Sequence, residues 1–391
     1  MTFRIRPAVA DDLQHLYEMA KLTGGGFTNL PPDRKSLGAK LADSATAFAR
    51  DGEHQPGELF VLILENAETG DVRGTCQIFT GVGTAWPFYS YRLTTLTQHS
   101  KELDRVFTAE MLNLVNDLGG ASEVGGLFLH PAERAGGLGM LLARSRYLFI
   151  AMHRERFAER IFAELRGVID ERGGSPFWDG VAGRFFGMNF QEADQFNAIN
   201  GNQFIADLMP KHPVYTAMLP ESARSVIGLP HPSGRAAMRM LEAENFHFEG
   251  YVDIFDGGPT MTARTDKVQS IADARHVALT GIEAERGDKV LIATGKLGGF
   301  RCCFGVAVED PDGQGIAINS AAAARSASAC ASSPADLHAL PRIASSPART
   351  ADASAPSASP SMSAVIASRS AVSSGSGYSP FFCSASSSSP A

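Results

Sequence analysis

The chain has 391 residues, of which 44% are hydrophobic and 20% are charged, and its formal net charge at pH 7 is −7. This composition is typical of a globular protein rather than a disordered one, and the length allows two domains. The acidic balance argues against a nucleic-acid-binding surface, which usually carries an excess of Lys and Arg.

Three further features predict a cytoplasmic protein without a metal site. The five cysteines form no spaced framework, and the adjacent Cys302 and Cys303 suit neither a zinc pair nor an ordinary disulfide. The N-terminal segment 1–13 is charged, unlike a signal peptide. No apolar run has the length that a bilayer span requires.

The first part of the chain predicts a strand, two helices and a hairpin. Residues 3–6 alternate in polarity like a short strand, and apolar residues recur at helical spacing over 13–22 and 33–50. The runs 58–65 and 72–80 are rich in β-forming residues, and a polar turn separates them. We therefore expect these two runs to pair as a hairpin.

A second group of elements surrounds a glycine-rich turn. Residues 124–129 predict a short strand, 140–152 a helix and 161–165 a buried strand. The resulting order, β-α-α-β-β-β-α-β, indicates an α/β sandwich rather than a bundle or a barrel. We assign residues 1–200 to this first domain.

A second, smaller α+β unit is predicted over residues 201–320. The elements expected there are a helix over 234–244 and strands over 246–255, 290–294 and 304–308.

The composition changes abruptly from residue 321 onwards. Residues 321–391 are mostly Ser and Ala with scattered Pro, a mixture that cannot bury enough apolar surface to offset its ordering entropy. We therefore predict a disordered C-terminal tail without a catalytic role. Such a composition is also what GC-rich DNA yields out of frame, so one hypothesis is a lost reading frame near residue 320; the alternative is a natural flexible extension.

The glycine-rich turn spans Arg134 to Gly139, with the sequence Arg-Ala-Gly-Gly-Leu-Gly. Small residues let a backbone approach a diphosphate closely, and the N–H groups at the start of the following helix attract anions. Arg134 can add a charge-assisted contact. A dinucleotide fingerprint would need a small residue where Leu142 stands, and a phosphate-binding loop would need Gly-Lys-Ser/Thr. A plain turn without a ligand remains the alternative.

The pattern Arg134-x-x-Gly137-x-Gly139 after a strand resembles the acyl-CoA signature of the GNAT superfamily. A wider set of strings is similar to arginine N-succinyltransferase. These strings include PFYSYR (87–92), RGVIDERGGSPFW (166–178), RFFGMNF (184–190), IADLMPKHPVY (205–215) and GYVDIFDGGPT (250–260). The resemblance implies a GNAT-like α/β acyltransferase fold followed by the second unit.

The same resemblance implies an acyl-CoA-dependent enzyme. The family transfers succinyl from succinyl-CoA to the α-amino group of L-arginine, the first step of arginine catabolism, with succinyl-CoA as co-substrate and no other cofactor. Leu127 matches the position that contacts succinyl-CoA, and Arg134, Gly137 and Gly139 match the CoA-binding turn. His231 matches the proposed proton donor.

Some residues depart from the family pattern. Gly125 and Gly126 precede Leu127 where the family usually has Cys-Thr, and Pro230 precedes His231. The changes beside the thioester site leave the acyl-donor preference open. Two alternatives for the function also stay open: an acyltransferase for ornithine or another amine, and a non-catalytic subunit of a heteromeric arginine/ornithine succinyltransferase. Either reading fits a homo- or hetero-oligomer without nucleic-acid or membrane partners.

Charged substrate groups need charged partners. The succinyl carboxylate requires a cation, and the guanidinium requires a carboxylate. The candidates are Arg92, Arg166, Glu123, Asp117, Asp253 and Asp256. A structural or capping role is the alternative for each of them.

Overall fold

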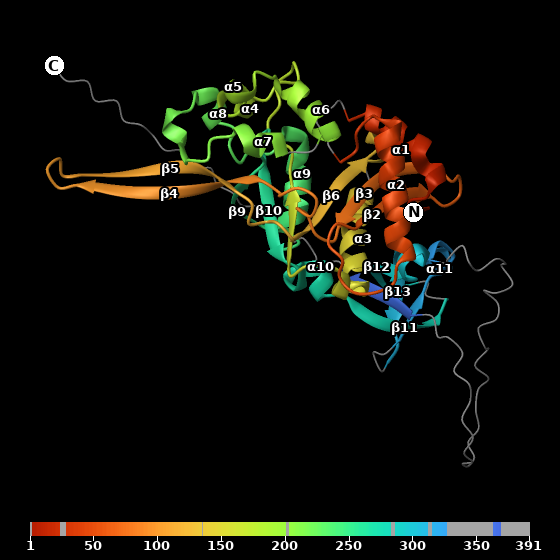
Figure 1. Ribbon diagram of the computed structural model, residues 1–391. Helices are drawn as coiled ribbons and strands as arrows, with labels where there is room; N and C mark the ends of the chain where they lie inside the picture. The colour runs from red at the N-terminus through yellow and green to blue at the C-terminus, as the bar shows by residue number, and fades with distance from the viewer. Residues whose placement is uncertain are drawn as a thin grey trace, which may run out of the picture.

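The computed structural model describes most of the chain and shows one long twisted sheet with helices packed against it (Figure 1). The described residues are 2–23, 29–134, 136–200, 203–282, 286–311, 315–326 and 363–368.

The first strands pair antiparallel in the order β1, β2, β3, β6. Their bounds are β1 (Phe3–Pro7), β2 (Leu59–Asn66), β3 (Val72–Phe79) and β6 (Ser122–Leu129), and the helices α1 (Leu13–Lys21) and α2 (Arg34–Ala49) lie between β1 and β2 in sequence. The predicted hairpin, the first strand and both helices are confirmed. Alternate residues of β2 pack on the two faces: Val61 and Ile63 contact the core under α1 and α2, and Phe60 contacts the opposite core.

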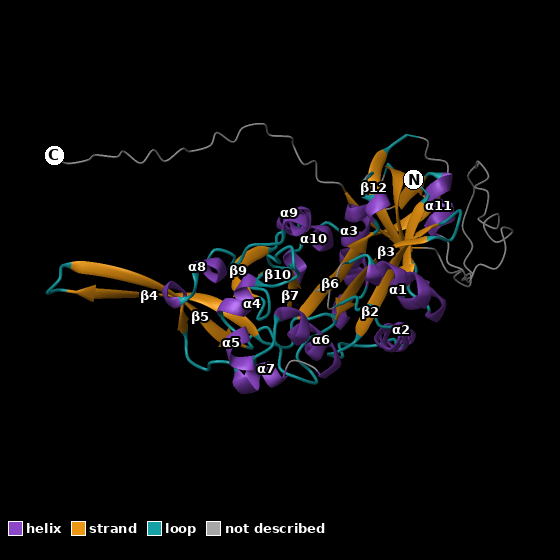
Figure 2. Cartoon of the chain, turned by 90° about the horizontal axis from the view of Figure 1, so that it is seen from above, coloured by secondary structure: helices purple, strands orange, loops and turns teal. Residues whose placement is uncertain are grey.

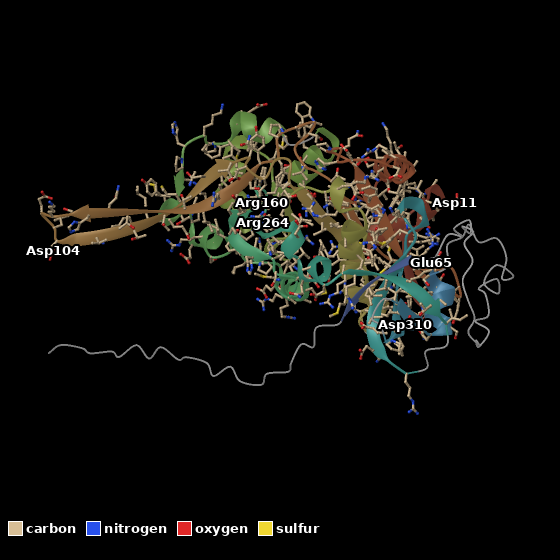
Figure 3. The ribbon with its side chains drawn as sticks, turned by 90° about the horizontal axis from the view of Figure 1, so that it is seen from below. Asp11, Glu65, Asp104, Arg160, Arg264 and Asp310 are labelled. Atoms are coloured by element: carbon tan, nitrogen blue, oxygen red, sulfur yellow. The ribbon has the colours of Figure 1, made fainter. Side chains whose placement is uncertain are left out.

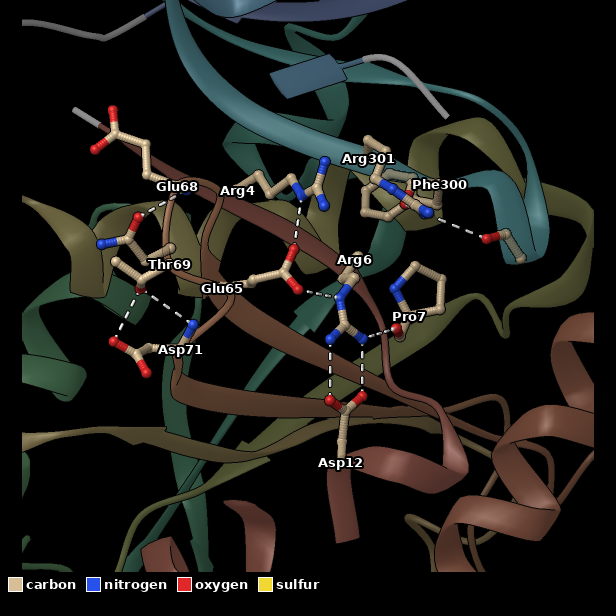
Figure 4. A network of polar contacts seen from close by, with 12 residues as sticks. Arg4, Arg6, Pro7, Asp12, Glu65, Glu68, Thr69, Asp71, Phe300 and Arg301 are labelled. Atoms are coloured by element: carbon tan, nitrogen blue, oxygen red, sulfur yellow. Dashed lines mark hydrogen bonds and ion pairs between the residues drawn. The ribbon is translucent and has the colours of Figure 1, made fainter. Parts of the chain in front are cut away.

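A polar network fixes the first strand to its neighbours (Figure 4). The Glu65 carboxylate on β2 accepts from Arg4 Nε at 2.7 Å and from Arg6 Nε at 2.9 Å. Arg6 also donates two hydrogen bonds to Asp12, at 2.8 and 2.9 Å. The planar guanidinium matches a carboxylate in this two-bond geometry, so the network sets the start of α1 relative to β1.

The predicted helix after the glycine turn forms α3 (Leu138–Met152), and it connects β6 to β7 (Arg160–Glu164). These two strands run parallel and pair only at Ser122 with Ile161 and at Glu123 with Phe162. Because β6 continues to Leu129, the described strands separate beyond Glu123. The separation leaves one side of β6 open along its second half.

A long hairpin, β4 (Ser90–Ser100) with β5 (Arg105–Val115), is absent from the sequence-based prediction. It leaves the body on the side away from α1 and α2, and Asp104 marks its tip (Figures 2 and 3). Its base joins β9 (His247–Val252) through Tyr91 and Arg92. The outer part of the hairpin is exposed, and its residues are mostly polar on both faces. No apolar pattern therefore revealed it in the sequence.

Short helices cover the sheet near the base of this hairpin. They are α4 (Pro176–Gly180), α5 (Gly183–Phe186), α6 (Phe190–Asn200), α7 (Gln203–Leu208) and α8 (Glu221–Arg224), with the short strand β8 (Val214–Tyr215). Their core centres on Trp178, which stacks between Phe186 and Phe255 at centroid distances of 5.5 and 5.6 Å. These short helices pack against the loop that follows β7.

The second half of the chain extends the same sheet. Its elements are α9 (Arg235–Glu242), β9, β10 (Pro259–Arg264), α10 (Gln269–Ala272), β11 (Arg275–Gly281), β12 (Asp288–Thr294), β13 (Arg301–Glu309), β14 (Gly315–Ile318), α11 (Ser320–Ser326) and β15 (Ser363–Ser368). Single-turn 3-10 helices occur at Ala10–Asp12, Pro131–Glu133, Arg154–Arg156, Thr216–Met218, Pro232–Gly234, Thr265–Lys267 and Leu297–Gly299.

Because β10 pairs with β7 and β13 pairs with β1, the 15 described strands form one continuous sheet. The predicted division between residues 200 and 201 stays a proposal, since the sheet crosses it.

Five of these strands close into a ring. β12 pairs with both β13 and β15, β15 pairs with β11, β11 with β14, and β14 with β13. Apolar side chains from the ring form a separate buried cluster that includes Ile292, Cys303, Ile316 and Ile366. A closed ring leaves none of its strands with an open edge, as in a small barrel.

Two stretches of the predicted disordered tail depart from that prediction. Residues 321–326 belong to α11, and residues 363–368 form β15. For β15 the physical reason lies in Val365 and Ile366, which interrupt the Ser-rich composition and bury their side chains to 1% and 4% exposure. For α11 it lies in Ala322, Ala323 and Ser326, which are buried. The rest of the segment 321–391 lies outside the described residues.

Candidate active site

The glycine turn lies at the N-terminus of α3. Gly136 and Gly137 have φ values of 72° and 83°, in the left-handed region that favours glycine. The helix starts at Leu138, two residues before the predicted start, with Gly137 as its N-cap. Ala135 lies outside the described residues. This arrangement brings Gly139 into the first helical turn, where backbone N–H groups have no helical partner and can bind an anion.

Leu127 lies on a bulge of β6. The pairs with β3 pass from Gly125–Gln77 to Phe128–Thr75, so Gly126 and Leu127 together oppose a single residue of β3. Gly126 has φ 58°, and a Cβ atom there would come within 2.8 Å of the Gln77 side chain. The bulge turns the backbone at Leu127 at the point where β6 and β7 have separated.

A buried polar cluster lies against the glycines of this bulge. The Asn29 carbonyl oxygen accepts from Lys40 Nζ at 3.0 Å and from Gln77 Nε2 at 2.7 Å, and Asn29 Nδ2 donates to Glu123 Oε1 at 3.3 Å. Burial raises the pKa of Glu123 to about 7. Burial also lowers the pKa of Lys40 to about 8, although the Glu123 charge opposes that shift. Of these residues the sequence suggested only Glu123.

His231 lies beside the end of β7. Its backbone N–H donates to the Arg166 carbonyl oxygen at 2.7 Å, and its Nδ1 is 3.2 Å from the Ser233 N–H nitrogen and 2.7 Å from Ser233 Oγ. Because a backbone N–H can only donate, Nδ1 is an acceptor and the neutral ring carries its proton on Nε2. Burial, followed by the charge of Arg166, lowers the pKa of His231.

Asp253 and Asp256 hold the loops around His231 together. Asp256 accepts from the N–H groups of Gly167 at 2.7 Å and Gly258 at 2.8 Å, and Asp253 Oδ1 accepts from Phe255 and Asp256. Burial, followed by the Asp253 charge, raises the pKa of Asp256 to about 8. These bonds give both residues the structural role that the sequence left open as an alternative.

Arg92 and Asp117 contact each other rather than the bulge. Arg92 Nη1 is 3.5 Å from Asp117 Oδ2, the Tyr251 hydroxyl donates to the same oxygen at 2.7 Å, and the guanidinium of Arg92 lies 5.0 Å from the Tyr251 ring centroid. Both side chains of the ion pair are 45% exposed.

Glu164 at the end of β7 is a titratable residue that sequence reasoning missed. Burial raises its pKa well above the usual range, and the charges of Asp253 and Glu123 act in the same direction. Its carboxyl therefore lies near both β6 and the His231 loop. An acidic residue within an otherwise apolar strand was the available signal.

No group of three or more His, Cys, Asp or Glu side chains in the described ranges is arranged to hold a metal ion. None of their helices combines the length and apolarity that crossing a membrane requires.

The chain is similar in sequence to known proteins. The profile of the family described as arginine N-succinyltransferase beta subunit matches residues 3–270, and the profile of the C-terminal domain of that subunit matches residues 275–325. The chain belongs to the arginine N-succinyltransferase family. Arginine N-succinyltransferases from Salmonella paratyphi B and Salmonella typhimurium are each 44% identical over 285 residues, which is 73% of this chain and 82% of theirs.

A solved structure from the family supports the fold. The arginine/ornithine succinyltransferase subunit AI of Pseudomonas aeruginosa superposes with a TM-score of 0.77 at 29% identity, and the match covers 94% of this chain and 98% of that one. The resemblance identified from the motifs is confirmed, together with the GNAT-like fold and the assignment to the acyltransferases. The roles of Leu127, Arg134, Gly137, Gly139 and His231 stay predictions.

Proposed function

We propose that this protein transfers the succinyl group of succinyl-CoA to the α-amino group of L-arginine. The observation that carries the proposal is the separation of β6 from β7 directly before the glycine turn of α3. A thioester at the β6 bulge and a diphosphate at the turn suit the two ends of one extended CoA molecule. Membership of the arginine N-succinyltransferase family supports the choice of acyl group and amine.

The CoA diphosphate lies on the turn in this proposal. The left-handed glycines Gly136 and Gly137 let the backbone approach the phosphates, and the N-terminal N–H groups of α3 donate to them. Arg134 precedes the turn and supplies a positive charge. No metal is needed to neutralise a diphosphate held in this way, and succinyl-CoA is a co-substrate rather than a resident cofactor.

Transfer requires a neutral amine, stabilisation of the oxyanion and a proton for the thiolate. The amine nitrogen attacks the thioester carbon, the carbon–sulfur bond breaks, the nitrogen loses a proton and the sulfur gains one. The backbone N–H of Leu127 on the bulge donates to the oxyanion. The imidazolium form of His231 gives a proton to the sulfur and becomes neutral. Ser233 contacts Nδ1, so Nε2 is the ring nitrogen free to donate to the sulfur.

A thiol-release assay with succinyl-CoA tests the proposal, using arginine and, because the P. aeruginosa relative is named for both amines, ornithine. We expect His231→Ala to lower kcat at least tenfold, since a positioned proton donor contributes about 10²- to 10⁴-fold, while CoA affinity is kept. His212→Ala changes an exposed histidine and serves as the control.

Two results would contradict the proposal. The first is wild-type protein that releases no thiol with either amine, a result that favours a non-catalytic subunit. The second is full turnover by the His231→Ala variant, which would remove the assigned proton donor. The expected homo- or hetero-oligomeric state is tested separately, by light scattering of the purified protein.

A further inference from the structure

The acyl group of succinyl-CoA ends in a carboxylate, which a binding site must recognise. The inference below rests on the proposed function, which places the thioester carbonyl at Leu127. From that point the acyl chain continues past the bulge of β6. A carboxylate that leaves water there needs a cation with a free hydrogen-bond donor, because a buried unpaired charge is strongly unfavourable.

The side chains next to the bulge are those of the Asn29 cluster, which we define as Asn29, Lys40, Gln77 and Glu123. A Cβ atom on Gly125 would lie 2.7 Å from Asn29 Nδ2 and 2.7 Å from Glu123 Oε1. A Cβ atom on Gly126 would lie 2.8 Å from Gln77 Cδ. The bare backbone of the bulge therefore stands directly against this cluster, so the cluster offers polar groups beside an acyl chain at Leu127.

Lys40 is the cation of the cluster. Its ammonium group has three N–H donors, and the Asn29 carbonyl takes one of them at 3.0 Å. The side chain is half-buried, so an anion that reaches it is largely removed from water. Burial lowers the pKa of Lys40 to about 8, a shift that a bound carboxylate would reverse.

Glu123 does not neutralise Lys40 in the way of an ordinary ion pair. Its Oε1 accepts from Asn29 rather than from Lys40, and burial raises its pKa to about 7. A substantial fraction of the Glu123 carboxyl is therefore protonated near neutral pH. The charge of Lys40 then stays available for another anion.

Two other arginines near the site donate to protein groups. Arg146 on α3 donates through Nε to the Ala143 carbonyl oxygen at 3.1 Å and through Nη1 to the Gly125 carbonyl oxygen of the bulge at 3.5 Å, and Arg92 is paired with Asp117. Arg166, whose Nε is buried without a hydrogen-bond partner among the described residues, acts on His231 beyond the end of β7. We propose that Lys40, held in place by Asn29, binds the terminal carboxylate of the succinyl group and so determines the preference for succinyl-CoA over uncharged acyl-CoA donors.

The test compares succinyl-CoA with butyryl-CoA, which has the same number of acyl carbons and a methyl group in place of the carboxylate. Lys40→Met keeps an unbranched side chain, one atom shorter than that of lysine, and removes its charge. We expect kcat/KM for succinyl-CoA to fall about 10- to 100-fold, the size of one lost charged hydrogen bond, while kcat/KM for butyryl-CoA is unchanged or rises. Calorimetric titration of both donors without amine should show the same loss in affinity for succinyl-CoA alone.

Three variants control the experiment. Lys35→Met removes an exposed lysine of the same helix and should leave both donors unaffected. Lys40→Arg keeps the charge and should retain a preference for succinyl-CoA. Asn29→Ala should weaken that preference by freeing Lys40. If Lys40→Met does not fold, the donor ratio of Lys40→Arg against Lys40→Gln gives the same comparison.

The outcomes separate the two proposals. Wild-type protein that uses neither donor contradicts the proposed function. Wild-type protein that uses succinyl-CoA, with a donor ratio unchanged by Lys40→Met, contradicts the role of Lys40 alone. Equal losses with both donors would also overturn it, because they would assign Lys40 a structural role beside Glu123.

Discussion

At the scale of single residues, Gly126 is a position where a side chain would be poorly tolerated. It combines φ 58° with a Cβ position 2.8 Å from Gln77. We expect Gly126→Ala to lower the free energy of unfolding by about 1–2 kcal/mol from backbone strain, with a further loss from displacing Gln77. Urea denaturation measures the change.

A glycine elsewhere gives the matched control. Gly38 lies inside α2 with no atom within 4 Å of its Cβ position, so Gly38→Ala should raise stability by up to about 1 kcal/mol. A Gly126→Ala variant as stable as wild type would mean that the bulge relaxes without cost.

The Glu123 carboxyl predicts a pH dependence of stability. Its pKa is raised from 4.5 to about 7 by burial, so the folded protein holds a proton that the unfolded chain releases between these values. Stability due to this group is therefore present below about pH 4.5 and lost as the pH rises through 7. Each unit of pKa shift corresponds to about 1.4 kcal/mol.

The variant Glu123→Gln has no such proton to release. We expect the melting temperature of wild type to fall relative to Glu123→Gln as the pH is raised from 5 to 8. Differential scanning calorimetry at several pH values measures this difference. A difference that stays constant over the range would show that Glu123 is ionised throughout.

Candidate residues could be located from the sequence where a local motif marks them, although their roles stay predictions. The turn from Arg134 to Gly139 is continuous in sequence, and His231 is marked by its His-Pro motif. The Asn29 cluster was not predictable, since it combines residues from the segment before α2, from α2 itself, from β3 and from β6. Each of these residues alone has the pattern of an ordinary surface or strand residue.

At the scale of elements, periodicity predicted the strands and helices that bury one face. It failed for β4 and β5, because beyond Leu96 and Ala109 the hairpin buries little surface and shows no apolar face. Because it buries so little surface, we expect the outer hairpin to contribute little to stability.

The hairpin can be shortened at a pair of residues that face each other on its two strands. Leu96 and Ala109 lie opposite each other, so replacing residues 97–108 with Asn-Gly closes the strands with a two-residue turn. We expect the melting temperature to change by only a few degrees, because the removed residues contact little besides each other. A large fall would indicate that the tip, where Leu103 is 74% exposed, is covered by another molecule in solution.

At the scale of the whole molecule, one sheet joins the site to the C-terminal ring through β1 and β13. The ring depends on β15, whose Val365 and Ile366 are buried. Burying such a side chain contributes about 1.5–3 kcal/mol. The C-terminal composition did not predict this strand, because two apolar residues among many Ser and Ala residues do not form a recognisable strand pattern.

Two truncated chains distinguish the contribution of β15 to stability from that of the residues that follow it. A chain that ends at residue 326 should unfold at a lower temperature than the full chain, since β11 and β12 then lose their shared partner. A chain that ends at residue 368 keeps β15 and should match the full chain. Equal melting temperatures for the two truncated chains would show that β15 adds nothing to the ring.

The position of β15 in the chain also has a consequence for biosynthesis. The other four strands of the ring are translated by Ile318, whereas its closing strand starts at Ser363. A nascent chain therefore carries two open strand edges while the intervening segment is still being synthesised. During that interval a matching strand from a second nascent chain can occupy the gap, so the rate of translation through this segment influences the yield of chains with a correctly closed ring.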